Sequence, residues 1–163
     1  MKKQTVIAVS GVKNSGKTTL LTKLIALLRA KGVSCAVIKH DGHGFAADRE
    51  GTDTCRLLAS GAMGAAIFDG EKYQAVKYAA VTEEDLFALY PEADLILLEG
   101  FKWTDYPKIE IVRRGVSEQA VCEPDTLIAL VTDTALRIPD VPTYAPDDIG
   151  ELAALLEREV RHD

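Results

Sequence analysis

Hydrophobic residues recur along the chain in two spacings, which predict alternating strands and helices. Short apolar runs typical of buried strands stand at residues 5–9, 33–38, 95–98 and 127–131. Leucine and isoleucine recur at helical spacing after the first run, over residues 19–30, and again over 146–160. This alternation predicts an α/β fold with a mostly parallel sheet.

A different pattern in the middle of the chain predicts an antiparallel hairpin. Residues 62–68 and 73–79 have the character of strands, and the turn between them contains Asp69-Gly70, a hairpin signal. The other expected elements are short helices over 53–59 and from 82 to about 91, with strands at 108–113 and 142–145. Residues 116–125 receive no assignment. No repeat, low-complexity segment or linker divides the chain, so we expect one domain over residues 1–163.

The segment from Gly11 to Thr18 indicates a specific chemistry. Its sequence, Gly-Val-Lys-Asn-Ser-Gly-Lys-Thr, matches the phosphate-binding loop G-x-x-x-x-G-K-[ST] and stands between an expected strand and an expected helix. Backbone N–H groups and the start of the helix then form an anion site. Lys17 is expected at the β- and γ-phosphates, and the Thr18 hydroxyl at Mg²⁺. The residues expected around the nucleotide phosphates are Lys13, Asn14, Ser15, Gly16, Lys17, Thr18 and Thr19.

An acidic motif follows the apolar run at 95–98. Glu99 and Gly100 stand at the carboxyl end of a buried strand, which is expected to emerge beside the phosphate loop. We expect Glu99 to bind Mg²⁺ through water or to orient an attacking water, and the Gly100 N–H to approach the γ-phosphate. Aspartate is more usual than glutamate in this position. Glu99 and Lys17 are therefore the expected catalytic residues.

Residues 39–52 form a long polar loop after a strand, and loops of this length in compact domains are usually functional or mobile. Asp48 is the expected Mg²⁺ ligand in it, with Asp41 and Asp53 left open as alternatives. A solvated connection without a metal role is the other interpretation. His40 and His43 form an H-x-x-H pair, for which zinc is conceivable, although no third ligand is fixed by spacing.

A carboxylate after the strand at 127–131 bears on the choice of base. Asp133 is placed to accept hydrogen bonds from guanine N1–H and N2–H₂, which adenine does not offer. The guanine signature Asn-Lys-x-Asp is absent, and only Thr132-Asp133 stands here. The residues alone therefore leave guanine and adenine open.

Composition narrows the classes of function. The chain has 163 residues, of which 47% are hydrophobic, so it can bury a core. Its net charge is −6 without a basic block, which argues against binding of nucleic acid or an anionic membrane. No apolar run approaches the roughly 20 residues that span a bilayer. Three cysteines without C-x-x-C spacing indicate a reduced, cytoplasmic protein.

These segments together resemble the molybdopterin-guanine dinucleotide biosynthesis protein B (MobB) family. The resemblance rests on the phosphate loop, on Ile38-Lys39-His40, on Asp48-x-x-Gly51-x-Asp53-Thr54 and on the run from Leu95 to Lys102, in matching order along almost the whole chain. It implies the three-layer P-loop NTPase fold, GTP binding with Mg²⁺, slow hydrolysis and a homodimer. It also implies an accessory role to the molybdopterin guanylyltransferase, which attaches GMP to molybdopterin.

The resemblance implies residue roles as well. Gly16, Lys17 and Thr18 would hold phosphate and Mg²⁺, Glu99 would be the second acidic motif, and Asp133 would read guanine. Val12 stands where related loops carry a signature lysine, so activation of one subunit by a lysine of the other is not expected. Two alternatives are an adaptor without hydrolysis and a small-molecule kinase. The candidate lid arginines of such a kinase are Arg49, Arg56, Arg113 and Arg114.

Overall fold

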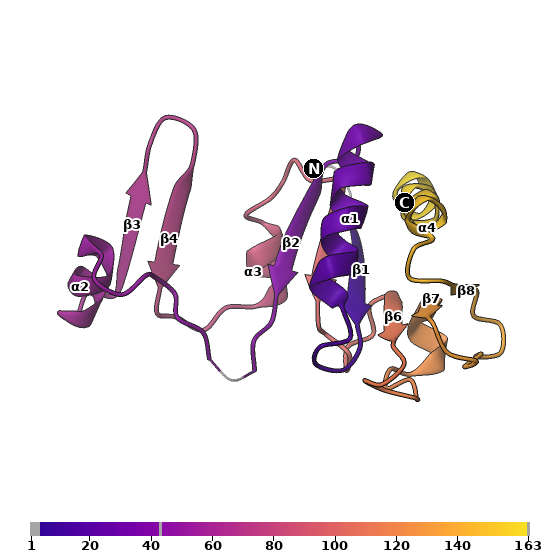
Figure 1. Ribbon diagram of the computed structural model, residues 1–163. Helices are drawn as coiled ribbons and strands as arrows, with labels where there is room; N and C mark the ends of the chain where they lie inside the picture. Colours follow the sequence, from indigo (N-terminus) through magenta and orange to yellow (C-terminus); the bar gives the residue numbers. More distant parts are fainter. Residues whose placement is uncertain (1–3, 43, 163) are drawn as a thin grey trace. The chain divides into compact units, whose positions relative to one another are not determined.

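The computed structural model describes residues 4–42 and 44–162, and the chain divides into two compact units (Figure 1). The first unit comprises Met1–His40 and Leu86–Asp163, and the second comprises Asp41–Asp85. The expectation of a single domain stays a prediction. The H-x-x-H alternative involves His43, which lies outside the described residues. Among the residues that are described, no group of three or more His, Cys, Asp or Glu is arranged to hold a metal ion.

The first unit is built on a six-stranded parallel sheet in the order β2-β5-β1-β6-β7-β8. Its strands are β1 (Thr5–Ser10), β2 (Cys35–Lys39), β5 (Leu95–Glu99), β6 (Lys108–Val112), β7 (Leu127–Thr132) and β8 (Thr143–Tyr144). β5 lies between β1 and β2, so the first two strands of the chain are parallel without pairing directly. The predicted mostly parallel α/β sheet is confirmed.

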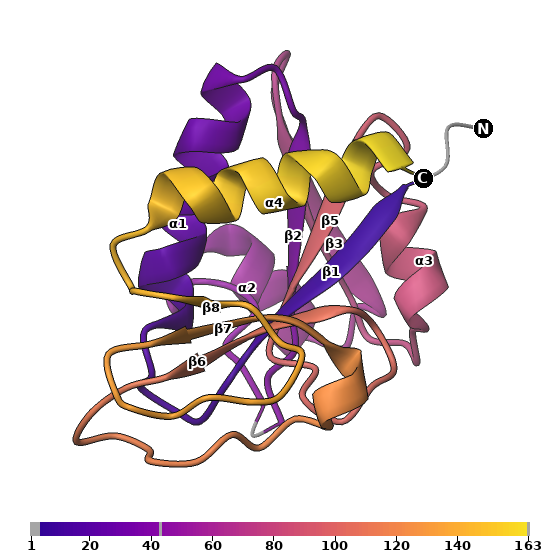
Figure 2. The ribbon, with the colours of Figure 1, turned by 90° about the vertical axis from the view of Figure 1, so that its right-hand side faces the viewer.

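Helices cover both faces of this sheet. α1 (Lys17–Ala30) and α4 (Ile149–His162) lie on the same face (Figure 2). Alternate residues of β1 explain the layering, because successive side chains of a strand point to opposite faces. Ile7 packs in one cluster with Leu24 of α1 and Leu156 of α4. Ala8 belongs to a second cluster, against which Phe87 packs from the short helix α3 (Glu83–Phe87). The predicted three-layer P-loop NTPase-like fold is confirmed.

The bounds of two helices depart from the sequence-based expectation. α3 ends at Phe87, not near Pro91. α4 begins at Ile149, not at Pro146, because residues 145–148 form a turn. In that turn the Asp148 N–H donates to the Ala145 carbonyl, and the Asp148 carboxylate accepts from the Ala145 N–H. The unassigned stretch 116–125 is loop that leads into a short 3₁₀ helix, η1 (Pro124–Thr126).

The second unit contains α2 (Asp53–Ala59) and the antiparallel pair β3 (Gly64–Phe68) and β4 (Tyr73–Lys77). The Thr52 hydroxyl caps α2 by accepting from the Cys55 N–H at 3.3 Å. The Asp69 carboxylate accepts from the N–H groups of residues 71 and 72 and so closes the hairpin turn. The predicted hairpin and its Asp-Gly turn are confirmed.

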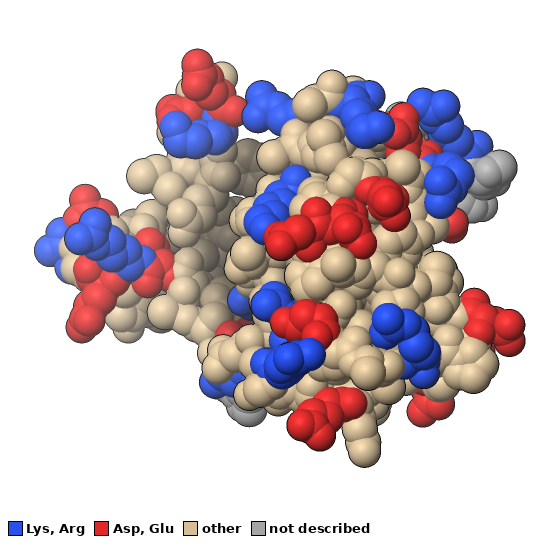
Figure 3. All heavy atoms as spheres, turned by 45° about the vertical axis from the view of Figure 1, so that its right-hand side comes forward, with Lys and Arg blue, Asp and Glu red and all other residues tan. Residues whose placement is uncertain are grey.

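Two features bear on the predictions from composition: the length of the apolar helices and the distribution of surface charge. In the part of the chain that is described, no helix is long and apolar enough to cross a membrane. On the face shown in Figure 3, basic and acidic side chains are interspersed, without a broad basic area.

Candidate nucleotide site

The carboxyl ends of the parallel strands meet at one edge of the sheet, and the expected site residues stand there. The phosphate loop follows β1, Glu99 ends β5, and Asp133 follows β7. In the register of the sheet, Glu99 pairs with Val9 on one side and with Lys39, the last residue of β2, on the other. The order of the strands therefore places both the phosphate loop and Lys39 next to Glu99. This edge is where ligands bind in open α/β sheets.

The phosphate loop has the backbone conformation of an anion-binding turn. Asn14 has φ 64° and Gly16 has φ 97°, both in the left-handed region, and α1 begins directly afterwards. The Lys17 ammonium donates to the carbonyls of Gly11, at 3.1 Å, and Val12, at 2.8 Å. The Ser15 hydroxyl is buried and has no hydrogen-bond partner among the described residues. A buried hydroxyl without a partner is costly, and a phosphate oxygen at the loop would fit it.

Gly11 is the position of the loop that least tolerates a side chain. It has φ 139°, and a Cβ there would lie 2.6 Å from the Ile111 carbonyl oxygen and 2.8 Å from the Ser15 hydroxyl oxygen. We expect Gly11→Ala to lower the free energy of unfolding by about 2–3 kcal/mol, since backbone strain and a backbone clash combine. Urea denaturation measures this change.

Gly32 provides the matched control for that substitution. It has φ 82°, but nothing lies within 4 Å of its Cβ position, so Gly32→Ala carries the backbone strain without the clash. We expect it to cost about 1 kcal/mol. Equal losses for the two variants would contradict the tight packing of the loop against β6.

Glu99 lies beside the phosphate loop, where the sequence predicted it. The Thr18 hydroxyl donates to its two carboxylate oxygens at 3.0 Å and 3.1 Å. The Lys39 ammonium lies 3.1 Å from the same oxygen, Oε1, that is 3.0 Å from the Thr18 hydroxyl. A hydroxyl and a carboxylate are hard oxygen ligands of the kind Mg²⁺ takes. The donor set fits the cation, and the roles of Thr18 and Glu99 in binding it stay predictions.

The turn after Glu99 is held tightly. The Gly100 N–H donates to the Val9 carbonyl at 3.0 Å, and the Ser10 hydroxyl donates to the Gly100 carbonyl. Phe101 has φ 48°, and its ring meets the His40 ring edge-on at 5.8 Å between centroids. A contact from the Gly100 N–H to a γ-phosphate would replace its bond to Val9, and this contact stays a prediction.

The electrostatics of this edge favour an anion. Burial lowers the pKa of Lys17, the Glu99 carboxylate opposes that shift, and the charges of Lys102 and Lys39 add to it. Three ammonium groups thus act at a place where Glu99 supplies a negative charge. Such an excess of positive charge attracts polyphosphates.

Asp133 lies at the end of β7, bound to two neighbouring residues. Its carboxylate accepts from the Arg114 backbone N–H at 2.7 Å and from Arg113 Nε at 2.9 Å. These contacts, the Arg114 N–H first, hold the pKa of Asp133 below its usual value. The carboxylate is therefore ionised at neutral pH, as acceptance of two hydrogen bonds from guanine requires. Its role as guanine reader stays a prediction.

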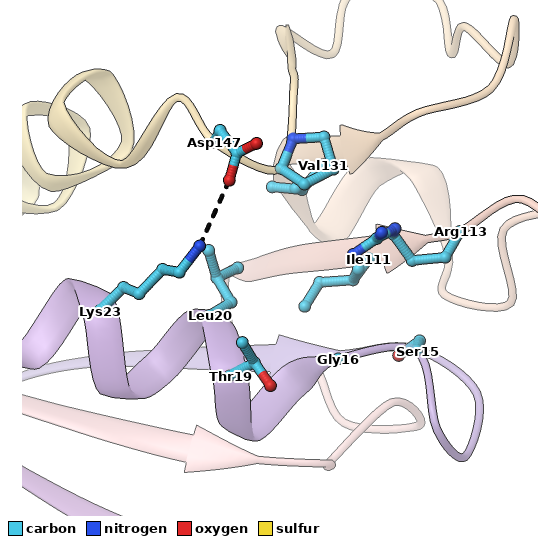
Figure 4. A pocket seen from close by; sticks show the side chains of 10 residues that line it. Ser15, Gly16, Thr19, Leu20, Lys23, Ile111, Arg113, Val131 and Asp147 are labelled. Carbon is cyan, nitrogen blue, oxygen red and sulfur yellow. Dashed lines mark hydrogen bonds and ion pairs between the residues drawn. The ribbon is translucent and has the colours of Figure 1, made fainter.

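A cavity of about 240 Å³ opens beside the phosphate loop (Figure 4). The Lys23 ammonium and the Asp147 carboxylate meet across one side of it at 3.3 Å, and Arg113 reaches it from the end of β6. Its lining consists of Ser15, Gly16, Thr19, Leu20, Lys23, Ile111, Arg113, Val131, Pro146 and Asp147. The cavity is thus lined by the phosphate loop together with both charged and apolar side chains.

Asp48 belongs to the second unit. Its carboxylate accepts from the Thr54 hydroxyl and from the Arg49 N–H, and the Thr54 bond is the first cause of a lowered pKa. Asp53 forms an ion pair with Arg56. The expectation that Asp48 reaches Mg²⁺ stays a prediction, as do the alternatives at Asp41 and Asp53.

Three side chains at the site were not among the residues predicted to bind nucleotide. Lys39 pairs with Glu99, Arg113 pairs with Asp133, and Lys23 pairs with Asp147. Lys39 and Arg113 each stand at or directly after the carboxyl end of an apolar run. A search for charged residues at strand ends would therefore have found both.

Comparisons with known proteins agree with this architecture. The family described as molybdopterin guanine dinucleotide synthesis protein B (MobB) matches residues 6–133. The molybdopterin-guanine dinucleotide biosynthesis adapter protein of Escherichia coli is 32% identical over 91% of this chain and 89% of its own length. The adapter protein of Haemophilus influenzae is 29% identical over 96% of this chain and 90% of its own.

A solved structure extends the likeness to three dimensions. The crystal structure of Bacillus subtilis MobB superposes with a TM-score of 0.77 at 27% identity, covering 95% of this chain and 97% of that one. The family match takes in the phosphate loop, Lys39, Glu99 and Asp133. The family that the sequence resembled is confirmed, and the chain belongs to the MobB family.

Proposed function

We propose that this protein is a GTP-binding adapter that assists the formation of molybdopterin guanine dinucleotide in the cytoplasm. The observation that carries the proposal is the phosphate loop with Thr18 hydrogen-bonded to Glu99, at the same sheet edge as Asp133. The adapter proteins of Escherichia coli and Haemophilus influenzae, which align with nearly the whole chain, give the pathway.

Different residues of the site bind different parts of the nucleotide. The loop N–H groups, the start of α1 and the Lys17 ammonium hold the phosphates. Thr18 and Glu99 hold Mg²⁺, which would neutralise charge on the phosphate oxygens. The cavity beside Thr19 takes the nucleoside, and Asp133 accepts from the guanine edge. Lys23 and Asp147, which face each other across that cavity, bring polar groups to the ribose.

We expect this site to hydrolyse GTP slowly. An arginine that stabilises the transition state raises the rate roughly 10³–10⁵-fold. Arg113, which lies near the loop, is bound to Asp133 through its Nε. Glu99 is left to orient a water while it also accepts from Thr18 and pairs with Lys39. Arg113 is paired with Asp133 and Arg56 with Asp53, so neither arginine supports the alternative of a kinase lid.

The experiment that tests the proposal adds the protein to a molybdopterin guanylyltransferase from the same source. We expect the yield of molybdopterin guanine dinucleotide at limiting GTP to rise when the protein is present. Heat-denatured protein and the Lys17→Ala variant serve as controls that cannot deliver GTP. An unchanged yield with active protein would overturn the adapter role.

We further expect a homodimer, and the hairpin of the second unit is the surface that supports it. Phe68 is 81% exposed and stands opposite Tyr73, which is 68% exposed, so the two rings lie on the same face of the hairpin. Large apolar side chains gathered in this way mark protein interaction sites. A two-stranded sheet alone is at best marginally stable in water. A second copy of the chain would cover these side chains.

Phe68→Glu tests the dimer by placing a charge in that surface. We expect sedimentation equilibrium to show a dimer for the wild type and at least a tenfold weaker association for Phe68→Glu, since a buried unpaired charge is costly. Val116→Glu is the matched control, because Val116 is an exposed apolar residue of the first unit. A monomeric wild type, or equal dimerisation of all three proteins, would contradict this expectation.

A further inference from the structure

Lys39 lies closer to the phosphate chemistry than its place on an edge strand suggests. β2 is the outermost strand of the sheet beside β5, and Lys39 is its last residue. The Lys39 ammonium lies 3.1 Å from Glu99 Oε1, and the Thr18 hydroxyl donates to that same oxygen at 3.0 Å. One carboxylate oxygen therefore separates the ammonium from the hydroxyl that binds the cation in loops of this type.

The position of Thr18 indicates which phosphate lies nearest. In P-loop NTPases the metal at the loop hydroxyl bridges the β- and γ-phosphate oxygens. A cation held by Thr18 and Glu99 would therefore lie near the terminal phosphate. The Lys17 ammonium, by contrast, is bonded to the loop carbonyls of Gly11 and Val12.

The Lys39 side chain is exposed enough to move toward a bound ligand. It is 59% exposed, whereas the Glu99 side chain is 9% exposed. The buried carboxylate fixes the location of the ammonium, and the exposed stem lets it shift without disturbing the core. An ion pair in which one partner is this exposed contributes little to stability, so a structural role alone is a poor explanation for the pair.

We propose that Lys39 binds the terminal phosphate and makes the site prefer a nucleoside triphosphate to the diphosphate. The inference rests on the proposed nucleotide site and adds to it a residue that determines specificity. The diphosphate lacks the group that Lys39 contacts, so the charge of Lys39 acts mainly on the triphosphate.

Calorimetric titration of GTP and GDP, both with Mg²⁺, tests the proposal. We expect Lys39→Ala to weaken GTP binding about tenfold or more and GDP binding less than about threefold, because a hydrogen bond between charged groups is lost only with GTP. Lys39→Arg keeps the charge and should retain most of the preference. Lys31→Ala is the matched control, since it removes a lysine from a surface ion pair, with Glu157 at 2.9 Å. That control should leave the ratio of GTP to GDP affinity unchanged.

The same substitution in a Glu99→Gln protein distinguishes a direct contact between Lys39 and the phosphate from an effect that acts through Glu99. In Glu99→Gln the ion pair is gone, but Lys39 remains. If Lys39 contacts the phosphate, Lys39→Ala weakens GTP binding in this background too. A loss seen only when Glu99 is present, or equal losses for GTP and GDP, overturns the inference alone. A wild-type protein that binds neither nucleotide overturns the proposed function and this inference together.

Discussion

Lys17→Ala is expected to weaken GTP binding by about 100-fold or more, which is the usual scale for removing one partner of a buried charge pair. The Lys17 ammonium lies against the carbonyls of Gly11 and Val12 at the mouth of the loop, where burial lowers its pKa and Glu99 opposes that shift. These contacts hold the ammonium at the loop, where the nucleotide phosphates are expected. Calorimetric titration with GTP and Mg²⁺ measures the loss.

Two observations accompany that measurement. Thermal unfolding shows whether Lys17→Ala remains folded, since the substitution also removes two hydrogen bonds to loop carbonyls. Lys31→Ala, a lysine at the other end of α1 paired with Glu157, should bind GTP as the wild type does. Micromolar affinity retained by a folded Lys17→Ala protein would remove the phosphate loop from the site.

Asp133→Asn is expected to exchange guanine for xanthine as the preferred base. The carboxylate accepts two hydrogen bonds from guanine, whereas an amide can donate to the xanthine carbonyl. We expect GTP affinity to fall about 100-fold and XTP affinity to rise about tenfold, because an unpaired polar group in the complex is costly. Competition between the two nucleotides for the purified variant measures the ratio.

The pairing of Asp133 with Arg113 calls for its own control. Asp133→Asn removes the negative charge from the ion pair with Arg113, at 2.9 Å, as well as one acceptor for the guanine donors. Arg113→Ala removes the same pair but leaves the carboxylate, so it should still prefer GTP to XTP. An unchanged base preference in Asp133→Asn would exclude Asp133 from base recognition.

Much of the fold follows from local pattern. The alternation of Ile7, Ala8 and Val9 between two clusters is the period of a strand buried on both faces, and the apolar run itself shows it. Glu99 could be placed beside Thr18 for a similar reason, since parallel strands end at one sheet edge. Both inferences need only the identity of the elements.

The remaining contacts depend on which strands are neighbours, and sequence order does not reveal that. Lys39 meets Glu99 because β5, which comes later in the chain, pairs with β2. The loop at 116–125 likewise could not be assigned. It is held from a distance by Glu110, a buried carboxylate of β6 that accepts from the N–H groups of Val121 and Cys122. Such a contact leaves no periodic trace in the loop itself.

The measurement that tests the central claim most directly is competition of GTP against ATP for the purified wild-type protein with Mg²⁺. A fluorescent GTP analogue bound at the site reports displacement by each nucleotide. We expect GTP to displace it at a concentration at least about tenfold lower than ATP, because guanine offers the Asp133 carboxylate the adjacent N1–H and N2–H₂ donors and adenine does not. Equal displacement, stronger displacement by ATP, or no binding of the analogue would contradict a guanine-nucleotide site.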